Sequence, residues 1–64
     1  MLMINGDPHD LAGIPVQEML ERLGFRPERV VVERNGKIIP RTEYNVTILE
    51  DNDTVEVVSF VGGG

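Results

Sequence analysis

The sequence contains no cysteine, and only one of its 64 residues is a histidine. Without cysteine the chain forms no disulfide bond, and it has no thiolate to act as a nucleophile, a zinc ligand or a persulfide carrier. The single histidine, His9, stands between Asp7 and Asp10, which is a weak ligand set for a metal. No Ser/His/Asp or Cys/His set is available either. We therefore expect neither a bound metal nor a catalytic side chain.

Basic residues are also scarce. Six lysines and arginines stand against eleven aspartates and glutamates, which gives a net charge of −5. Nucleic acid is a poor ligand for such a chain, because its phosphates require a basic protein surface. A partner with a basic surface is favoured, since opposite charges speed the encounter of two proteins. The alternative is that the net acidity only keeps a small protein in solution.

Long hydrophobic runs are absent. The apolar segment Met1–Ile4 is too short for a signal peptide, and no run approaches the length of a membrane span. We therefore expect a cytoplasmic protein. A chain of 64 residues makes one domain with a modest core. It has no room for an enclosed active site as well, which argues against an enzyme and for a monomeric module that works with a partner.

Turn signals dominate the start of the chain. Asn5-Gly6 is typical of a two-residue hairpin turn, because both of its central residues need a positive φ. It follows an apolar strand at 1–4 and precedes a returning strand at 7–11. Pro8 has no N–H group to donate, which predicts that the returning strand lies at the edge of a sheet.

A single helix is predicted over Pro15–Leu23, where apolar residues recur at helical spacing. Gly24 fits the left-handed position that follows many helices, with Phe25 folding back onto Leu20 in a Schellman arrangement. The other predicted elements follow in chain order: a strand at 30–33, a turn at Asn35-Gly36, a strand at 37–39, a turn at 41–45 with Tyr44 pointing inward, an extended piece at 46–49, an acidic turn at 50–53 and a strand at 54–61. This order predicts an α+β fold, with a mixed sheet of four to five strands and the helix on one face.

The alternation of residues along the predicted strands assigns them to two faces. Val55 and Val57 share the inward side, so Val58 and Phe60 lie on the exposed side. If the strand at 30–33 is a neighbour, Val31 joins them, with Met3 as a further member. Contiguous exposed apolar surface often marks a binding site, so we predict that these four residues contact a partner; the alternative is that loops cover them.

Three glycines, Gly62, Gly63 and Gly64, follow the last predicted strand directly. Glycine has no Cβ, so such a segment can enter a narrow site on a partner. Three extended residues reach about 10 Å. We predict a domain at 1–61 and a flexible tail at 62–64 that presents the Gly64 carboxylate. The alternative is a frayed end or an expression scar.

Four segments together resemble the ThiS family, the small sulfur carriers of thiamine thiazole synthesis. They are a strand that leads into Asn35–Arg41, an aromatic residue shortly after it at Tyr44, an acidic turn at Asp51–Asp53, and the ending Val55–Gly64. The one departure is Asn52, where the family more often has glycine, and it bears on the geometry of the turn. The resemblance implies a β-grasp, ubiquitin-like fold.

The resemblance also implies a function that resides in the tail. A ThiF-like enzyme would adenylate the Gly64 carboxylate with ATP and magnesium, and a sulfur donor protein would convert it to a thiocarboxylate. A thiazole synthase of the ThiG type would then accept the sulfur. Gly63 and Gly64 correspond to the terminal pair of the family, and Gly62 is a commonly seen extra glycine. The chain itself would be a carrier, not an enzyme, with no bound cofactor.

Three alternatives stay open at the level of the sequence. One is a carrier of the same fold that serves another pathway, such as a MoaD-like subunit for molybdopterin or a carrier for cysteine synthesis. Another is a ubiquitin-like modifier that is joined to target lysines through Gly64. The last is an interaction domain whose tail takes no part in chemistry.

Overall fold

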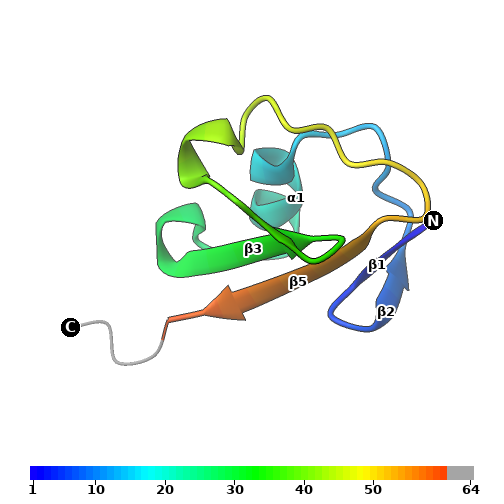
Figure 1. Ribbon diagram of the computed structural model, residues 1–64, viewed down its shortest axis with the longest axis horizontal. Helices are drawn as coiled ribbons and strands as arrows, with labels where there is room; N and C mark the ends of the chain where they lie inside the picture. Colours follow the sequence, from blue (N-terminus) through cyan, green and yellow to red (C-terminus); the bar gives the residue numbers. More distant parts are fainter. Residues whose placement is uncertain (61–64) are drawn as a thin grey trace.

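The computed structural model describes residues 1–60, which form a mixed sheet with one α-helix packed on one face (Figure 1). Its elements are β1 (Leu2–Ile4), β2 (Asp7–His9), α1 (Val16–Arg22), the 3₁₀-helix η1 (Pro27–Arg29), β3 (Val30–Arg34), β4 (Lys37–Ile39), the 3₁₀-helix η2 (Arg41–Glu43) and β5 (Thr54–Ser59). None of the helices within residues 1–60 has the length and apolar character needed to cross a bilayer.

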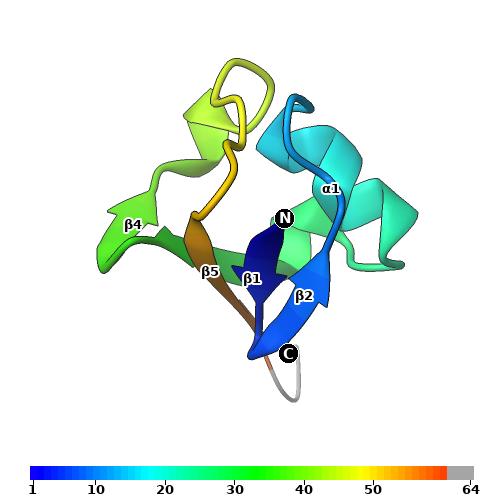
Figure 2. The same cartoon turned by 90° about the vertical axis from the view of Figure 1, so that its right-hand side faces the viewer.

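The five strands lie in the order β2-β1-β5-β3-β4. β1 and β5 pair in parallel, whereas β1 with β2, β3 with β4, and β3 with β5 pair antiparallel. The last strand of the chain is therefore the middle strand of the sheet. Figure 2 shows α1 on one side of this sheet, with the opposite face uncovered. The α+β fold and the mixed sheet predicted from the sequence are confirmed.

Both Asn-Gly turns form as predicted. Asn5 and Gly6 have φ of 52° and 86°, and Asn35 and Gly36 have the same values, which is the requirement of a type I′ hairpin turn. β2 lies at the sheet edge, as the proline at its centre predicts. The strand is shorter than expected and ends at His9.

The helix α1 begins one residue later and ends one residue earlier than predicted, with Pro15 at its N-cap. Its C-terminal end is a Schellman motif, since the amide of Phe25 donates to the Leu20 carbonyl at 2.9 Å and the amide of Gly24 donates to the Glu21 carbonyl at 3.2 Å. Gly24 has a φ of 84°. The sequence predicted this termination correctly, because glycine has no Cβ and adopts a positive φ more readily than any other residue.

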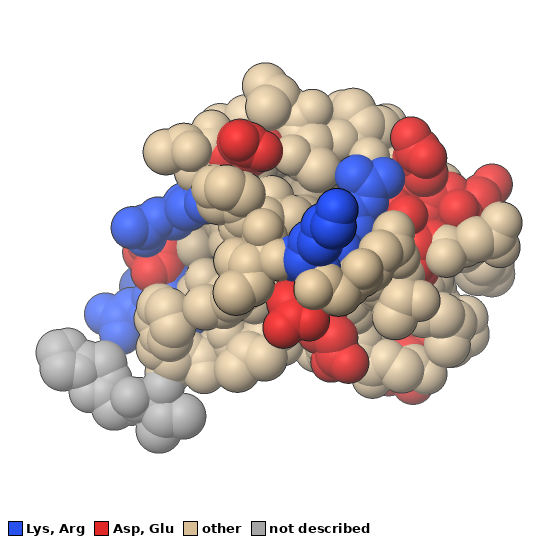
Figure 3. All heavy atoms as spheres, in the orientation of Figure 1, with Lys and Arg blue, Asp and Glu red and all other residues tan. Residues whose placement is uncertain are grey.

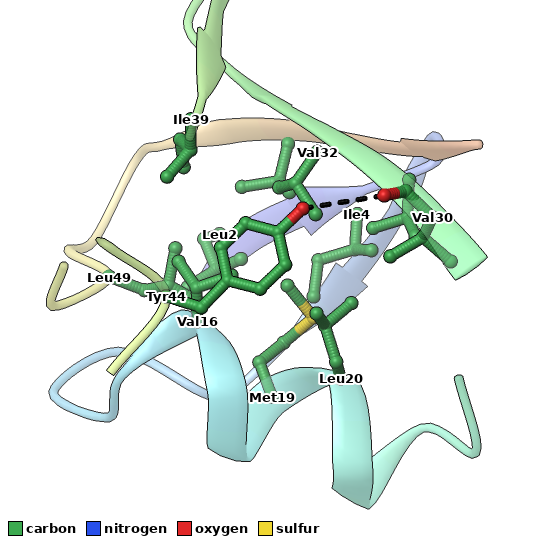
Figure 4. Close-up of a cluster of buried hydrophobic side chains, with 12 residues drawn as sticks. Leu2, Ile4, Val16, Met19, Leu20, Val30, Val32, Ile39, Tyr44 and Leu49 are labelled. Carbon is green, nitrogen blue, oxygen red and sulfur yellow. Dashed lines mark hydrogen bonds between the residues drawn. The ribbon is translucent and has the colours of Figure 1, made fainter. Parts of the chain in front are cut away.

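The core lies between α1 and the inner face of the sheet (Figure 4). Tyr44, at the C-terminal end of η2, points inward as predicted, and its hydroxyl donates to the Val30 carbonyl at 3.4 Å. Burial raises the pKa of the Tyr44 hydroxyl. The other buried apolar side chains are Leu2, Ile4, Val16, Met19, Leu20, Val32, Ile39, Leu49, Val55, Val57 and Val30 itself. Each such side chain contributes about 1.5–3 kcal/mol to folding.

The segment at 46–49, predicted as a short extended piece, is not one of the five strands of the sheet. Only Ile48 forms a β-bridge, and its partner is Pro15 at the start of α1. The Thr47 carbonyl accepts a hydrogen bond from the Val16 amide at 2.9 Å, and the Leu49 amide donates to the Ile14 carbonyl at 2.9 Å. This segment therefore pairs with the entry to the helix and not with the sheet, because the first amides of a helix need acceptors from outside it.

A buried carboxylate joins the acidic turn to the start of β5. Asp53 is only 6% exposed, and it accepts hydrogen bonds from Arg34 Nε at 2.8 Å, Asn35 Nδ2 at 3.0 Å and the Glu50 amide at 2.8 Å. Burial alone would raise its pKa, but these three hydrogen bonds and the charge of Arg34 outweigh burial and hold the pKa of Asp53 below its usual value. Asn52 precedes it with a φ of 72°, which asparagine tolerates in a turn.

Replacing Asp53 with asparagine is expected to lower the free energy of unfolding by about 2 kcal/mol at neutral pH, because charge-assisted hydrogen bonds are lost and a buried amide faces Arg34. Because the pKa is lower in the folded state, the ionised carboxylate stabilises that state. This stabilisation by the Asp53 carboxylate is complete at pH values above 3.8, the ordinary pKa of the group. It is lost as the pH falls through the lower pKa of the folded state.

Denaturation by urea across a pH series measures both effects. Wild type should lose stability below about pH 4 more steeply than Asp53→Asn, because the variant lacks the titrating group. The exposed Asp51→Asn variant is the matched control and should stay close to wild type at neutral pH. Parallel pH curves for wild type and Asp53→Asn would contradict the role of Asp53.

Candidate functional site

The central strand β5 leads directly into the residues that the sequence singles out. Gly62, Gly63 and Gly64, together with Val61, lie outside the described residues. The strand itself is held on both sides, by β1 in parallel and by β3 antiparallel. The last pairing contact within residues 1–60 is a hydrogen bond from the Phe60 amide to the Arg29 carbonyl at 2.8 Å. The backbone of Phe60, one residue past β5, is therefore held by the last residue of η1.

A side chain extends the pairing on the β1 side. β1 ends at Ile4, and the amide of Asn5 donates to the Val55 carbonyl at 2.9 Å. The Asn5 side chain then accepts from the Val57 amide at 2.8 Å and donates to the Val57 carbonyl at 3.2 Å. Its amide group thus takes the place of the next residue of a longer β1 strand. The sequence predicted Asn5 as a turn residue and gave no signal for this second role.

Asn35 acts in a similar way on the β3 side. Its side-chain oxygen accepts from the Thr54 amide at 2.9 Å, and its own amide donates to the Thr54 carbonyl at 2.8 Å. The first asparagine of each Asn-Gly turn therefore binds the backbone of β5. The two turns lie on opposite sides of β5. Together they hold this strand, which precedes the predicted tail.

The outer face of the sheet, away from α1, brings together most of the predicted partner contacts. Val31 and Val58 are directly opposite one another in the β3–β5 register. Phe60 follows on the same face. Val58 is 60% exposed and Phe60 56% exposed, whereas Val31 is half-buried. These three residues are called the apolar patch below. Val58 and Phe60 are therefore exposed as predicted, Val31 is only partly so, and their contact with a partner stays a prediction.

Met3 is placed on the same face but not beside the apolar patch. It is 39% exposed, and it pairs with Thr54, which lies four residues before Val58 on β5. That separation is about 13 Å along the strand, and Glu56 lies between. The parallel register places β1 beside the first residues of β5. Met3 therefore lies near the start of β5, away from Val58 and Phe60.

A groove of about 250 Å³ adjoins the apolar patch. Val31 and Phe60 form one part of its lining, and Pro40 and Tyr44 form another. Arg41 also lines it, and its guanidinium donates to the Glu28 carbonyl at 3.2 Å. The sequence did not predict this groove, since β4 and η2 contribute to it only through the tertiary fold. It offers a place for an apolar side chain next to the start of the tail.

Charged groups are unevenly distributed over the molecule. In the view of Figure 3, acidic side chains gather at the end near the N-terminus, and further acidic groups lie on the side of the sheet away from α1. Among the described residues, no cluster of three or more histidine, aspartate or glutamate side chains is placed to hold a metal ion. His9 lies on the edge strand β2 and is partly buried.

This architecture is that of a small β-grasp domain, with a single helix across a mixed sheet and the last strand in the middle. The crystal structure of a thiamine biosynthesis protein (ThiS) from Geobacter metallireducens is similar to it, with a TM-score of 0.79, 37% sequence identity and coverage of 98% of this chain and 97% of that chain. The likeness confirms the β-grasp fold that the resemblance implied.

The sequence comparisons agree with the structural one. The chain matches the ThiS family over residues 2–64. It is 36% identical over 64 residues to the sulfur carrier protein ThiS of Thermus thermophilus, with all of both chains covered. It is also 45% identical over 62 residues to a thiazole synthase of Magnetococcus marinus, which covers 95% of this chain and 19% of that enzyme. The chain thus spans about a fifth of the length of that relative. It belongs to the ThiS family.

Replacing Asn5 with glycine is expected to release the β1 side of β5. Glycine keeps the positive φ of the turn, so the variant removes only the two side-chain hydrogen bonds to Val57. Each is worth about 1 kcal/mol. Hydrogen exchange measured by NMR should show faster exchange of the Val57 amide, with the Val32 amide in the core as the internal control. Unchanged protection of Val57 would contradict the assigned role of Asn5.

Proposed function

We propose that this protein is a sulfur carrier of thiamine biosynthesis and that Gly64 carries the sulfur as a C-terminal thiocarboxylate. The observation that carries the proposal is the family match, which extends through Gly64. The full-length similarity to the sulfur carrier protein ThiS of Thermus thermophilus supports it. The fold supports it as well, because β5 is the middle strand of the sheet and only Phe60 and Val61 separate it from the glycines in the sequence.

The chemistry requires an activated carboxylate, since a free carboxylate does not react with nucleophiles. Attack of the Gly64 carboxylate on the α-phosphate of ATP forms an acyl-adenylate and releases pyrophosphate. A sulfur nucleophile from a donor protein then attacks the acyl carbon, and AMP leaves. With a persulfide of the donor as the nucleophile, the product is an acyl disulfide. A thiolate then attacks the donor's own sulfur and forms a new disulfide with it, and the electron pair of the broken S–S bond stays on the sulfur of the Gly64 thiocarboxylate. ATP and magnesium belong to a ThiF-like partner, and this chain contributes the carboxylate and the surface by which it is recognised.

The acceptor of the sulfur in this proposal is a thiazole synthase of the ThiG type. The thiazole synthase of Magnetococcus marinus contains a region similar to this chain, so a carrier-like domain and that enzyme are joined in one polypeptide there. Such a joined arrangement supports a direct encounter between this carrier and a thiazole synthase. The glycines can pass into a narrow active site because they have no side chains.

Deletion of Gly63 and Gly64 is expected to abolish sulfur loading. After incubation with the ThiF-like enzyme, ATP, magnesium and a sulfur source, intact-protein mass spectrometry should show that wild type gains the mass difference between one sulfur and one oxygen. The truncated variant should gain none, while its circular dichroism spectrum stays that of wild type. Loading that survives the deletion would refute the tail mechanism, and adducts joined to other proteins would instead indicate a modifier.

Replacing Phe60 with aspartate is expected to weaken binding to the ThiF-like enzyme by about 2 kcal/mol, roughly 30-fold in Kd, if Phe60 enters a pocket on that partner. Isothermal titration calorimetry measures the change. Val46→Asp is the matched control, because Val46 is equally apolar and 72% exposed but lies outside the sheet. Equal affinities of the Phe60→Asp variant and wild type would remove Phe60 from the interface.

A further inference from the structure

Two glutamates lie side by side on the outer face of the sheet. Glu33 of β3 and Glu56 of β5 are directly opposite in the register, and both are exposed. The ladder bonds at Asn35–Thr54 and Phe60–Arg29 show that alternate pairs, including this one, are hydrogen-bonded, with Cα atoms about 5.5 Å apart. Both side chains therefore project from one face at close range, and like charges in this arrangement destabilise a sheet.

Neither glutamate forms an ion pair within residues 1–60. The ion pairs there join Arg22 to Glu18, Arg34 to Glu50 and Asp53, and the N-terminus to Asp51. Arg34 is next to Glu33 in sequence, but the alternation of the strand directs it to the other face, where Asp53 holds it. The repulsion between Glu33 and Glu56 is thus uncompensated by an ion pair in the described part of the chain.

The acidic pair is continuous with the apolar patch. Val31 and Val58 form the next pair on the same face, about 7 Å farther along the strands. Phe60 follows on the side toward the tail. A surface that covers the two valines and Phe60 therefore also covers the carboxylates of Glu33 and Glu56. Such a surface must supply positive charge there, because burying two unpaired carboxylates together is strongly unfavourable.

We propose that the outer face of the sheet binds a partner surface that places an arginine or lysine between Glu33 and Glu56 while its apolar side chains cover Val58 and Phe60. The proposal rests on the proposed function, and the partner is the ThiF-like adenylating enzyme. The cation relieves the repulsion that the free protein carries, and exclusion of water by the apolar contact strengthens the attraction. The pair therefore selects a partner by charge at the same face that binds it by apolar contact.

The test uses the full chain with both glutamates replaced, Glu33→Gln and Glu56→Gln. Calorimetric titration with the ThiF-like enzyme at several sodium chloride concentrations gives Kd and its dependence on salt. The double variant is expected to bind at least about 10-fold more weakly at low salt, with a flatter salt dependence. Its thermal midpoint is expected to equal or exceed that of wild type, because the repulsion is gone.

The matched control is the double variant Asp7→Asn with Asp10→Asn, which removes the same charge from exposed positions at the far edge of the sheet. It should bind like wild type. A Glu33→Gln/Glu56→Gln variant with wild-type affinity and salt dependence would overturn the inference. So would an equal loss in the control, since that would indicate only an effect of net charge.

Loading of wild type distinguishes the two proposals. If wild type gains the thiocarboxylate mass and the glutamate variant binds normally, only the inference about Glu33 and Glu56 fails. If wild type is neither bound nor loaded by the enzyme, the proposed function fails and this inference fails with it.

Discussion

Backbone pairing on both sides of β5 is the constraint on which the rest of the structure depends. The strand lies between β1 and β3, and asparagine side chains continue the pairing where the neighbouring strands turn away. Asp53 fixes its first residues through a buried set of hydrogen bonds. A short chain with a modest core thereby gives a defined position to its last described residue, and the proposed chemistry needs such a defined starting point.

The same constraint shapes the two faces of the domain. The inner face of the sheet supplies much of the core, and α1 covers it. No helix of residues 1–60 covers the outer face, which carries both the apolar patch and the pair of glutamates. A domain of this size has little room for a cleft that encloses a substrate, which is why the proposed function assigns recognition to the exposed face that precedes the proposed tail. In the proposed function, the outer face is recognised by the partner and the end of the chain reacts.

Much of the fold and of the exposed face was predictable from local sequence patterns. The two Asn-Gly turns, the Schellman end of α1, the edge position of β2 and the inward direction of Tyr44 each follow from the preferences of one or two residues. The exposed faces of Val58 and Phe60 followed from strand alternation. The segment at 46–49 was predicted as extended, but its partner was not, because its hydrogen bonds go to the start of the helix and the apolar run carries no signal for that pairing. The second role of Asn5, the groove beside Phe60 and the opposition of Glu33 and Glu56 depend on register, which single strands do not reveal.

The parallel pairing of β1 with β5 has a mechanical consequence. A pull on the end of β5 that is resisted at the start of β1 acts along the strands, so the hydrogen bonds between them are loaded in shear and share the load. A hairpin pulled from its two open ends would instead unzip one bond at a time. The pairing of β1 with β5 thus resists traction that is applied along β5 from its C-terminal end.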